Sequence, residues 1–217
     1  MKKLFCMVLA LVMLLGICAC GEDVRGTIGD GDTSNFDETE FSLGNAEGTT
    51  YKNDFLGLRF TLPEGWTFYT DQQILELNNL TGEYLDEDAA ELLENASIIY
   101  DMYAINASNS SNVNVNLEKL SLAQMAALNL QQTLEAQLPT IRSTYANMGY
   151  TDVEASYQKV IVGGKTYDGL RLVAKINGTD FFATAFTFAK GLYLANVTVC
   201  TMQVDQTDLL LDQFTFA

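Results

Sequence analysis

The chain has 217 residues, of which 28 are acidic and 12 basic, and its formal net charge is −16. A surface this acidic repels phosphate backbones and anionic lipid headgroups, which excludes nucleic-acid binding and membrane contact through a basic face. The chain contains no histidine. This excludes Ser-His-Asp and Cys-His nucleophile pairs and zinc sites with histidine ligands, and we expect neither a metal nor a cofactor.

The N-terminal segment resembles the signal peptide of a bacterial lipoprotein. MKK precedes an apolar run, residues 4–17, which is shorter than the about 20 residues that span a bilayer. Three positions match the lipobox pattern of an aliphatic residue, a small residue and the modified cysteine: Ile17, Ala19 and Cys20. Cys18 departs from it, since Ala or Ser is more usual there. An ordinary signal peptide, cut without lipidation, is the alternative.

The lipoprotein resemblance implies a definite location for the mature chain. Residues 1–19 are removed, Cys20 carries acyl chains such as palmitate, and the protein is tethered to the extracytoplasmic face of the cell membrane. Membrane contact is then made through the anchor alone.

Residues 20–50 form an acidic stretch in which Arg25 is the one basic residue. No period typical of a helix or strand repeats there, so we expect a disordered, self-repelling spacer. Its segment DGDTS, residues 30–34, begins like a calcium loop. Asn35 and Phe41 stand where an EF-hand needs Gly and Glu, which argues against a metal site.

Residues 51–217 are expected to form a single α+β domain. The first part mixes short strands and helices, since alternating apolar residues favour strands and Thr70 or Asp71, and later Asp86, can cap helices. The expected elements are strands at residues 56–62 and 66–69, helices at 71–80 and 87–95, and strands at 98–107 and 113–117.

The longest helix is predicted over residues 121–148. Ser121 and Gln124 have the spacing of a capping box, and a wide apolar stripe follows them. Pro139 can kink or restart this helix, and Gly149 can end it.

From residue 153 onward the apolar pattern alternates. Four alternating runs, residues 153–162, 165–176, 179–189 and 192–200, are separated by Gly-Gly, Asn-Gly and Lys-Gly. These dipeptides suit tight hairpin turns, so we expect a four-strand antiparallel meander, followed by a helix at 209–214 that Asp205 caps. The whole predicts an antiparallel sheet of about six to seven strands that ends in this meander, with helices packed on one face.

The opening of the domain resembles that of small lipoproteins from Gram-positive gut bacteria with a Mog1/PsbP-like domain. The positions that carry the resemblance are Asn53, Gly57, Pro63, Gly65 and Trp66. The order of elements over residues 51–217 is also similar. The resemblance implies this fold and a protein that binds partners; it brings no catalytic residues with it.

A few side chains are candidates for a site. Trp66 either fills the core or stacks on a ligand. In the run Tyr100–Tyr103, strict alternation places Tyr100 and Met102 on one face and Asp101 and Tyr103 on the other. Tyr103 is then a candidate for a solvent-facing aromatic patch that contacts a carbohydrate or a protein. Cys200 is expected to be a small core side chain.

Four acids gather near one predicted helix start: Asp86, Glu87, Asp88 and Glu91. Paired carboxylates can hydrolyse a glycoside when they flank the sugar, but acids at a helix start also interact favourably with its dipole. We therefore assign no catalytic residue. The expected function is a non-enzymatic module that binds an envelope protein or a small ligand. The alternative is a carboxylate-dependent hydrolase that acts on envelope or imported glycan.

Overall fold

The computed structural model describes residues 41–78, 96 and 98–217. Its centre is a seven-stranded sheet with the spatial order β4 (Trp66–Phe68), β5 (Ile98–Asn106), β6 (Asn112–Lys119), β10 (Tyr193–Met202), β9 (Thr179–Lys190), β8 (Lys165–Ile176) and β7 (Thr151–Val162). Neighbouring strands are antiparallel throughout. The fold is therefore α+β and mostly antiparallel sheet, as the sequence predicted.

The four-strand meander β7–β8–β9–β10 is confirmed. Its hairpin turns form where Gly and Asn were expected: Asn177 and Gly178 both have positive φ, 51° and 79°, which is the geometry of a tight two-residue turn between twisted strands. The N-terminal hairpins β4–β5–β6 then join the meander because β6 pairs with β10. The strands β4–β5–β6 and the meander β7–β8–β9–β10 thus form one continuous sheet.

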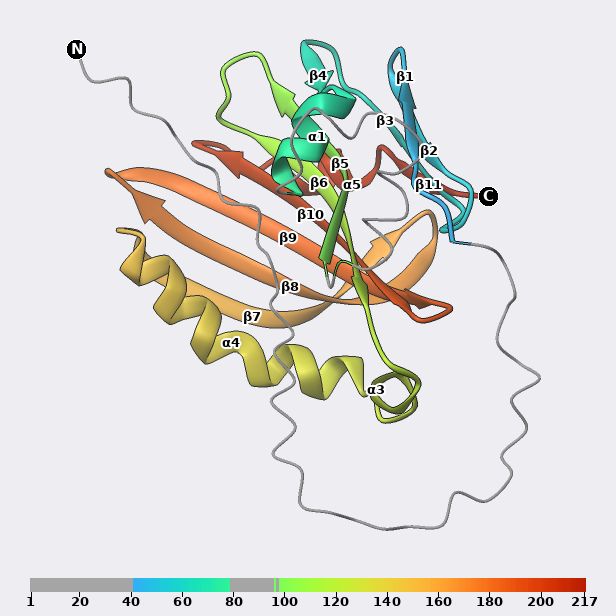
Figure 1. Ribbon diagram of the computed structural model, residues 1–217. Coiled ribbons are helices and arrows are strands. Elements are labelled where there is room, and N and C mark those ends of the chain that lie inside the picture. The colour runs from blue at the N-terminus through green and yellow to red at the C-terminus, as the bar shows by residue number, and fades with distance from the viewer. Residues whose placement is uncertain (1–40, 79–95, 97) are drawn as a thin grey trace.

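A second sheet, which the sequence did not predict, covers one face of the larger one (Figure 1). It consists of β1 (Asn45–Glu47), β2 (Thr50–Asn53), β3 (Leu58–Thr61) and β11 (Phe214–Phe216). The core between the two sheets includes Phe60 and Phe214, whose ring centroids are 4.6 Å apart, and Phe186 of the larger sheet.

Two sequence predictions fail in this second sheet. The spacer was expected to reach residue 50, but residues 45–47 form β1, and the Phe41 ring stacks on Tyr193 at 4.4 Å. A final helix was expected at residues 209–214. Instead α5 spans Thr207–Leu211, and Phe214 begins a strand that pairs with β3. The strand expected at residues 56–62 is present as β3, whereas the three-residue strands β1 and β11 are too short for alternation to reveal them.

The opposite face of the larger sheet is covered by helix. α4 (Leu130–Asn147) packs along β7 and β8 (Figure 1), and its buried residues Leu134, Ile141 and Tyr145 share a core with Leu172 and Phe181. Helices on one face were therefore predicted correctly for this side. None of the helices in the described part of the chain is long and apolar enough to cross a bilayer.

The predicted long helix is in fact two helices. The capping box of Ser121 and Gln124 is confirmed, but it caps only the short α3 (Leu122–Ala126). The chain then breaks, and Asn129 caps α4 by accepting a hydrogen bond from the Gln132 N–H at 3.1 Å. Pro139 lies inside α4 without ending it.

Farther upstream, α1 (Asp71–Leu77) begins at Thr70, which makes a capping box with Gln73. This confirms the predicted helix start, but the helix ends at Leu77 with Asn78 as its C-cap, short of the predicted end at residue 80. The predicted helix at 87–95 lies outside the described residues, as do all of residues 1–40, which include Cys20 and the calcium-loop-like segment.

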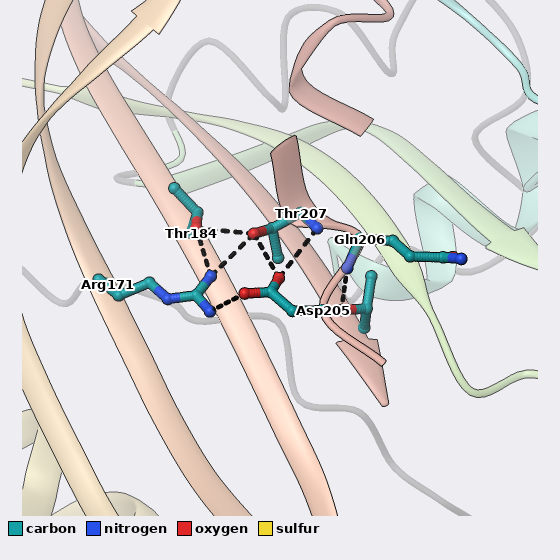
Figure 2. Close-up of polar contacts among 6 residues, drawn as sticks. Arg171, Thr184, Asp205, Gln206 and Thr207 are labelled. Carbon is teal, nitrogen blue, oxygen red and sulfur yellow. Dashed lines mark hydrogen bonds and ion pairs between the residues drawn. The ribbon is translucent and has the colours of Figure 1, made fainter. Parts of the chain in front are cut away.

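The start of α5 is held to the larger sheet by a polar network, which Figure 2 shows. Arg171 on β8 donates hydrogen bonds to the hydroxyls of Thr184 (2.9 Å) and Thr207 (2.8 Å), and its other terminal nitrogen pairs with Asp205. Asp205 also accepts hydrogen bonds from the backbone N–H (3.1 Å) and the hydroxyl (2.8 Å) of Thr207. The predicted cap thus exists, although the residue at the N-cap position is Gln206.

Candidate functional site

A cavity of about 280 Å³ lies at the edge of the larger sheet, between β5, α1 and residues 43–46. Four aromatic side chains line it: Phe68, Tyr69, Tyr100 and Tyr103. Two carboxylates line it as well, the exposed Asp71 at the start of α1 and the buried Asp101 of β5. Within the described part of the chain, no Lys or Arg is among the lining residues. We call this cavity the aromatic pocket.

The β5 wall of the aromatic pocket depends on a β-bulge at Asp101. The register with β6 shifts between Tyr100 and Met102. The extra residue keeps Tyr100 and Tyr103 on the helix-covered face, while Asp101 and Met102 turn toward the second sheet. The expectation from strict alternation was therefore wrong for this run, and Tyr103 is buried rather than solvent-facing.

The opposite wall is fixed to β5 by backbone and side-chain hydrogen bonds. The N–H of Tyr69 donates to the carbonyl of Tyr103 at 2.8 Å, and the two rings lie 4.5 Å apart. Asn78, which follows α1, bonds both backbone groups of Tyr100. These contacts hold β4 and α1 against the same edge, so the pocket is formed by anchored elements.

Asp101 closes the floor of the aromatic pocket with a network of donors. It accepts hydrogen bonds from the Tyr51 hydroxyl, from Asn53 Nδ2 at 2.7 Å and from the Gly44 N–H at 2.7 Å. Burial raises the pKa of Asp101, and the three hydrogen bonds oppose that effect without cancelling it. With three donors already bound, Asp101 supplies the pocket with negative potential more than with free hydrogen-bonding capacity.

The pocket phenols are held in the neutral form. Burial raises the pKa of Tyr100, and burial together with neighbouring groups raises the pKa of Tyr103. Neutral aromatic rings have electron-rich faces, and such faces attract cations. The pocket therefore offers rings and carboxylates but no positive charge.

Of the residues predicted for a site, the structure brings one into the pocket. Tyr103 lines it, whereas Trp66 is half-buried in β4, packs against the core between the sheets and is not among the lining residues. The acid cluster at residues 86–91 lies outside the described residues. Tyr69, Asp71 and the Asp101 network were missed; the density of aromatics at residues 66–69 and 100–103 was their one signal.

The remaining candidate groups are unreactive. Cys200 is a free, buried cysteine, and burial raises the pKa of its thiol to about 12, so it remains protonated and inert. Within residues 41–78, 96 and 98–217, no group of three or more His, Cys, Asp or Glu side chains has the arrangement to hold a metal ion.

Comparison with known proteins adds little to this picture. No family model and no curated protein matches the chain. Among solved structures, a crystal structure of a protein from Bacteroides thetaiotaomicron VPI-5482 is similar over 79% of this chain and 49% of its own, with 8% identity and a TM-score of 0.41. The chain thus spans about half the length of that protein. At this level the likeness carries no argument about fold or site.

Proposed function

We propose that the chain is a lipid-anchored extracytoplasmic lipoprotein whose domain is a non-enzymatic binding module, and that the aromatic pocket takes a small organic cation with an alkylammonium group. The single observation that carries this proposal is the lining: four aromatic rings and two carboxylates, with no basic side chain. A cation over an aromatic face gains about 0.5–2 kcal/mol, more as water is excluded, and this is how aromatic cages bind quaternary ammonium groups.

The same lining disfavours other ligand classes. An anion would meet Asp71 and Asp101 in a chain of net charge −16. A sugar needs several free hydrogen-bonding groups, but Asp101 is already bonded to three donors. A volume of about 280 Å³ is at the lower end for ligand pockets, which suits a small ligand.

The extracytoplasmic location and the Mog1/PsbP-like fold are also parts of this proposal. The support for an anchor is the sequence around Cys20, and the support for a Mog1/PsbP-like domain is the motif at residues 53–66. Two of its glycines, Gly57 and Gly65, have φ of 63° and 77°, so both occupy positions that favour glycine. An envelope protein that presents a cationic group is a partner consistent with this pocket.

The hydrolase alternative receives less support. Among the described residues, the carboxyls whose pKa lies above its ordinary value, because of burial, are Asp101 and Glu118. They lie on opposite faces of the larger sheet, since Asp101 bonds Tyr51 of the second sheet and Glu118 pairs opposite Leu194 on the helix-covered side. Glycoside hydrolysis needs two carboxyls about 5–9.5 Å apart around one sugar, and these two do not meet.

The test compares choline with its neutral isostere, 3,3-dimethylbutan-1-ol, by isothermal titration calorimetry on the full chain carrying Cys20→Ser. We expect choline to bind with a Kd below about 1 mM, and at least ten times more tightly than the isostere, because the two differ in charge rather than shape. Equal affinity for the two probes, or no binding of choline, overturns the proposal.

Substitutions of the pocket residues test whether choline binds in the aromatic pocket. Tyr69→Ala is expected to weaken choline binding at least tenfold, whereas Tyr69→Phe retains it because the ring face remains. Asp71→Asn is expected to weaken it about two- to fivefold, since an exposed charge is partly screened. Glu64→Gln is the matched control: it removes one exposed negative charge at a residue that does not line the pocket and should leave the affinity unchanged.

A further inference from the structure

The helix-covered face of the larger sheet carries an unusual run of buried polar side chains. On β6, every second residue on this face is polar: Asn112, Asn114, Asn116 and Glu118, each at most 8% exposed. Asn196 and Thr198 of β10 lie directly opposite Asn116 and Asn114, and both are buried. Thr187 of β9 lies opposite Asn196. We call these seven side chains the polar layer.

The polar layer is incompletely hydrogen-bonded. Among the described residues, six buried side-chain atoms have no hydrogen-bond partner: Asn112 Nδ2, Glu118 Oε2, Gln137 Oε1, Tyr145 Oη, Asn196 Nδ2 and Thr198 Oγ1. Four belong to the polar layer. The other two are on α4, where Gln137 falls between the buried Leu134 and Ile141 and so shares their sheet-facing stripe, and Tyr145 packs in the core beneath α4.

All six atoms therefore lie on the side of the larger sheet that carries α4, four of them on β6 and β10 and two on α4, which itself packs along β7 and β8. A buried polar atom without a partner costs about 1–3 kcal/mol, and native proteins leave few of them. Scattered examples would need no common cause, but a set confined to one layer indicates a shared missing partner. By contrast, the face toward the second sheet is apolar along the same strands, with Val113, Val115 and Leu117 on β6.

The chemistry of these atoms limits what the partner is. Asn112 and Asn196 offer N–H donors, Glu118 and Gln137 offer acceptors, and the two hydroxyls can do either. No Lys or Arg belongs to the set, so an anion finds no counter-charge. A sugar or polyol hydroxyl both donates and accepts, and thus matches this mixture. Residues 112–118 extend about 20 Å along a strand, which accommodates one or two sugar rings.

We propose that the polar layer is a second ligand site, which lies beside the aromatic pocket because Asn114 and Asn116 pair opposite Tyr103 and Tyr100, and which takes a small neutral polyhydroxylated ligand such as a mono- or disaccharide. Burial raises the pKa of Glu118 to about 7, so near neutral pH part of the population can also donate. A ligand would enter the polar layer most readily at the end beside α3, the helix that follows β6 directly. α3 buries none of its residues fully and Leu122 is 55% exposed, so displacing α3 costs chiefly the packing of Met125 on the small cluster of Leu120 and Leu194.

The test uses an isosteric pair of threonine variants in the full chain with Cys20→Ser. Thr198→Val removes a hydroxyl that has no partner, whereas Thr187→Val removes one that donates to Asn196 Oδ1 at 2.8 Å. The probes are glucose, N-acetylglucosamine, cellobiose and myo-inositol at 10 mM, and the readout is the shift in Tm, followed by calorimetry. We expect at least one probe to raise the Tm of the parent chain by more than 2 °C.

For the ligand-free proteins, we expect Thr198→Val to be at least as stable as the parent and Thr187→Val to be less stable. Thr198→Val should weaken sugar binding at least tenfold, while Tyr69→Ala should leave it unchanged. The proposal is overturned if no probe binds. It is also overturned if Thr198→Val destabilises the ligand-free protein, since an internal water would then be the partner, or if Tyr69→Ala abolishes sugar binding while Thr198→Val does not.

Discussion

The side-chain amide of Asn78 bonds the backbone of Tyr100 as a neighbouring strand would. Its Nδ2 donates to the Tyr100 carbonyl at 2.9 Å, and its Oδ1 accepts from the Tyr100 N–H at 2.7 Å. β4 ends at Phe68, so this part of the β5 edge is paired by a side chain. The residue just beyond α1 therefore continues the sheet edge and holds α1 over the aromatic pocket.

Asn78→Ala is expected to lower the free energy of unfolding by about 1–3 kcal/mol, because both backbone groups of Tyr100 lose their partner. It should also weaken choline binding, since α1 is no longer held to β5. Urea denaturation measures the first effect and calorimetry the second. The exposed Asn147→Ala is the control and should change stability by less than 0.5 kcal/mol; equal losses in the two variants would contradict the assigned role.

Glu118 is expected to make stability depend on pH. Burial raises its folded pKa to about 7 from 4.5, so the folded state holds this proton more tightly than the unfolded chain. The stability that the folded state gains by holding this proton is therefore fully present below about pH 4.5 and is lost as pH rises through 7. Relative to the parent, Glu118→Gln should be similar at pH 4 and more stable by roughly 2–3 kcal/mol at pH 8.

The measurement is chemical denaturation of the parent and Glu118→Gln at pH 4, 6 and 8. The difference between the two proteins isolates this carboxyl from all other titrating groups. Glu154→Gln, an exposed position on β7, is the control. A constant difference across the three pH values would contradict the assignment.

Asp101→Asn tests the floor of the aromatic pocket. The new amide group would place donors among the three donors that now face the carboxylate. We expect a loss of about 1–3 kcal/mol in the free energy of unfolding, because at least one of them is left without an acceptor. Asp54→Asn, whose exposed carboxylate pairs with Lys52 at 2.7 Å, should lose less than about 0.5 kcal/mol. Equal losses would show that the network contributes nothing.

Asp205→Asn tests the network that holds α5 (Figure 2). Burial acts to raise the pKa of Asp205, but the hydrogen bonds from Thr207 and Arg171 outweigh it and hold this pKa below the ordinary value. The stability that the ionised Asp205 contributes is thus present above its pKa in the unfolded chain and is lost as pH falls through its pKa in the folded protein. Since Asp205 is 42% exposed, we expect a loss of only about 1 kcal/mol at pH 7.

Asp180→Asn is the matched control for this change. It breaks an exposed pair with Lys175 at 3.0 Å and should lower stability by less than about 0.5 kcal/mol. The two variants are compared by thermal unfolding at pH 7 and pH 3. A difference between them that persists at pH 3 would argue against the ionised carboxylate as the cause.

The sequence predicted the parts of this fold in which local chemistry decides the structure. The meander follows from long alternating runs separated by Asn-Gly and Gly-Gly, and α1 follows from the cap at Thr70. β3 was expected as a strand at residues 56–62, but the second sheet was missed because β1 and β11 have three residues each and because β3 pairs with β11, which lies far along the chain. Pairing between distant segments leaves no periodic signal in either one.

The site was predicted only in part for a related reason. The aromatic run singled out Tyr103, which lines the pocket, but one bulge residue at Asp101 reversed the faces assigned to its neighbours. The partners of Asp101 come from the loop before β1 and from β2, more than forty residues earlier. The polar layer was visible as alternating Asn residues at 112–116, yet alternation alone does not tell a buried polar face from a solvated one.

The pairing of β3 with β11 has a consequence for how the chain reaches its folded state. Until residues 214–216 are available, β3 has an open edge beside Leu58 and Phe60, and open apolar edges favour association with other chains. A ribosome or a translocation channel that still held these residues would delay closure of the small sheet. The small sheet is therefore complete, and the β3 edge protected, only when β11 has paired with it.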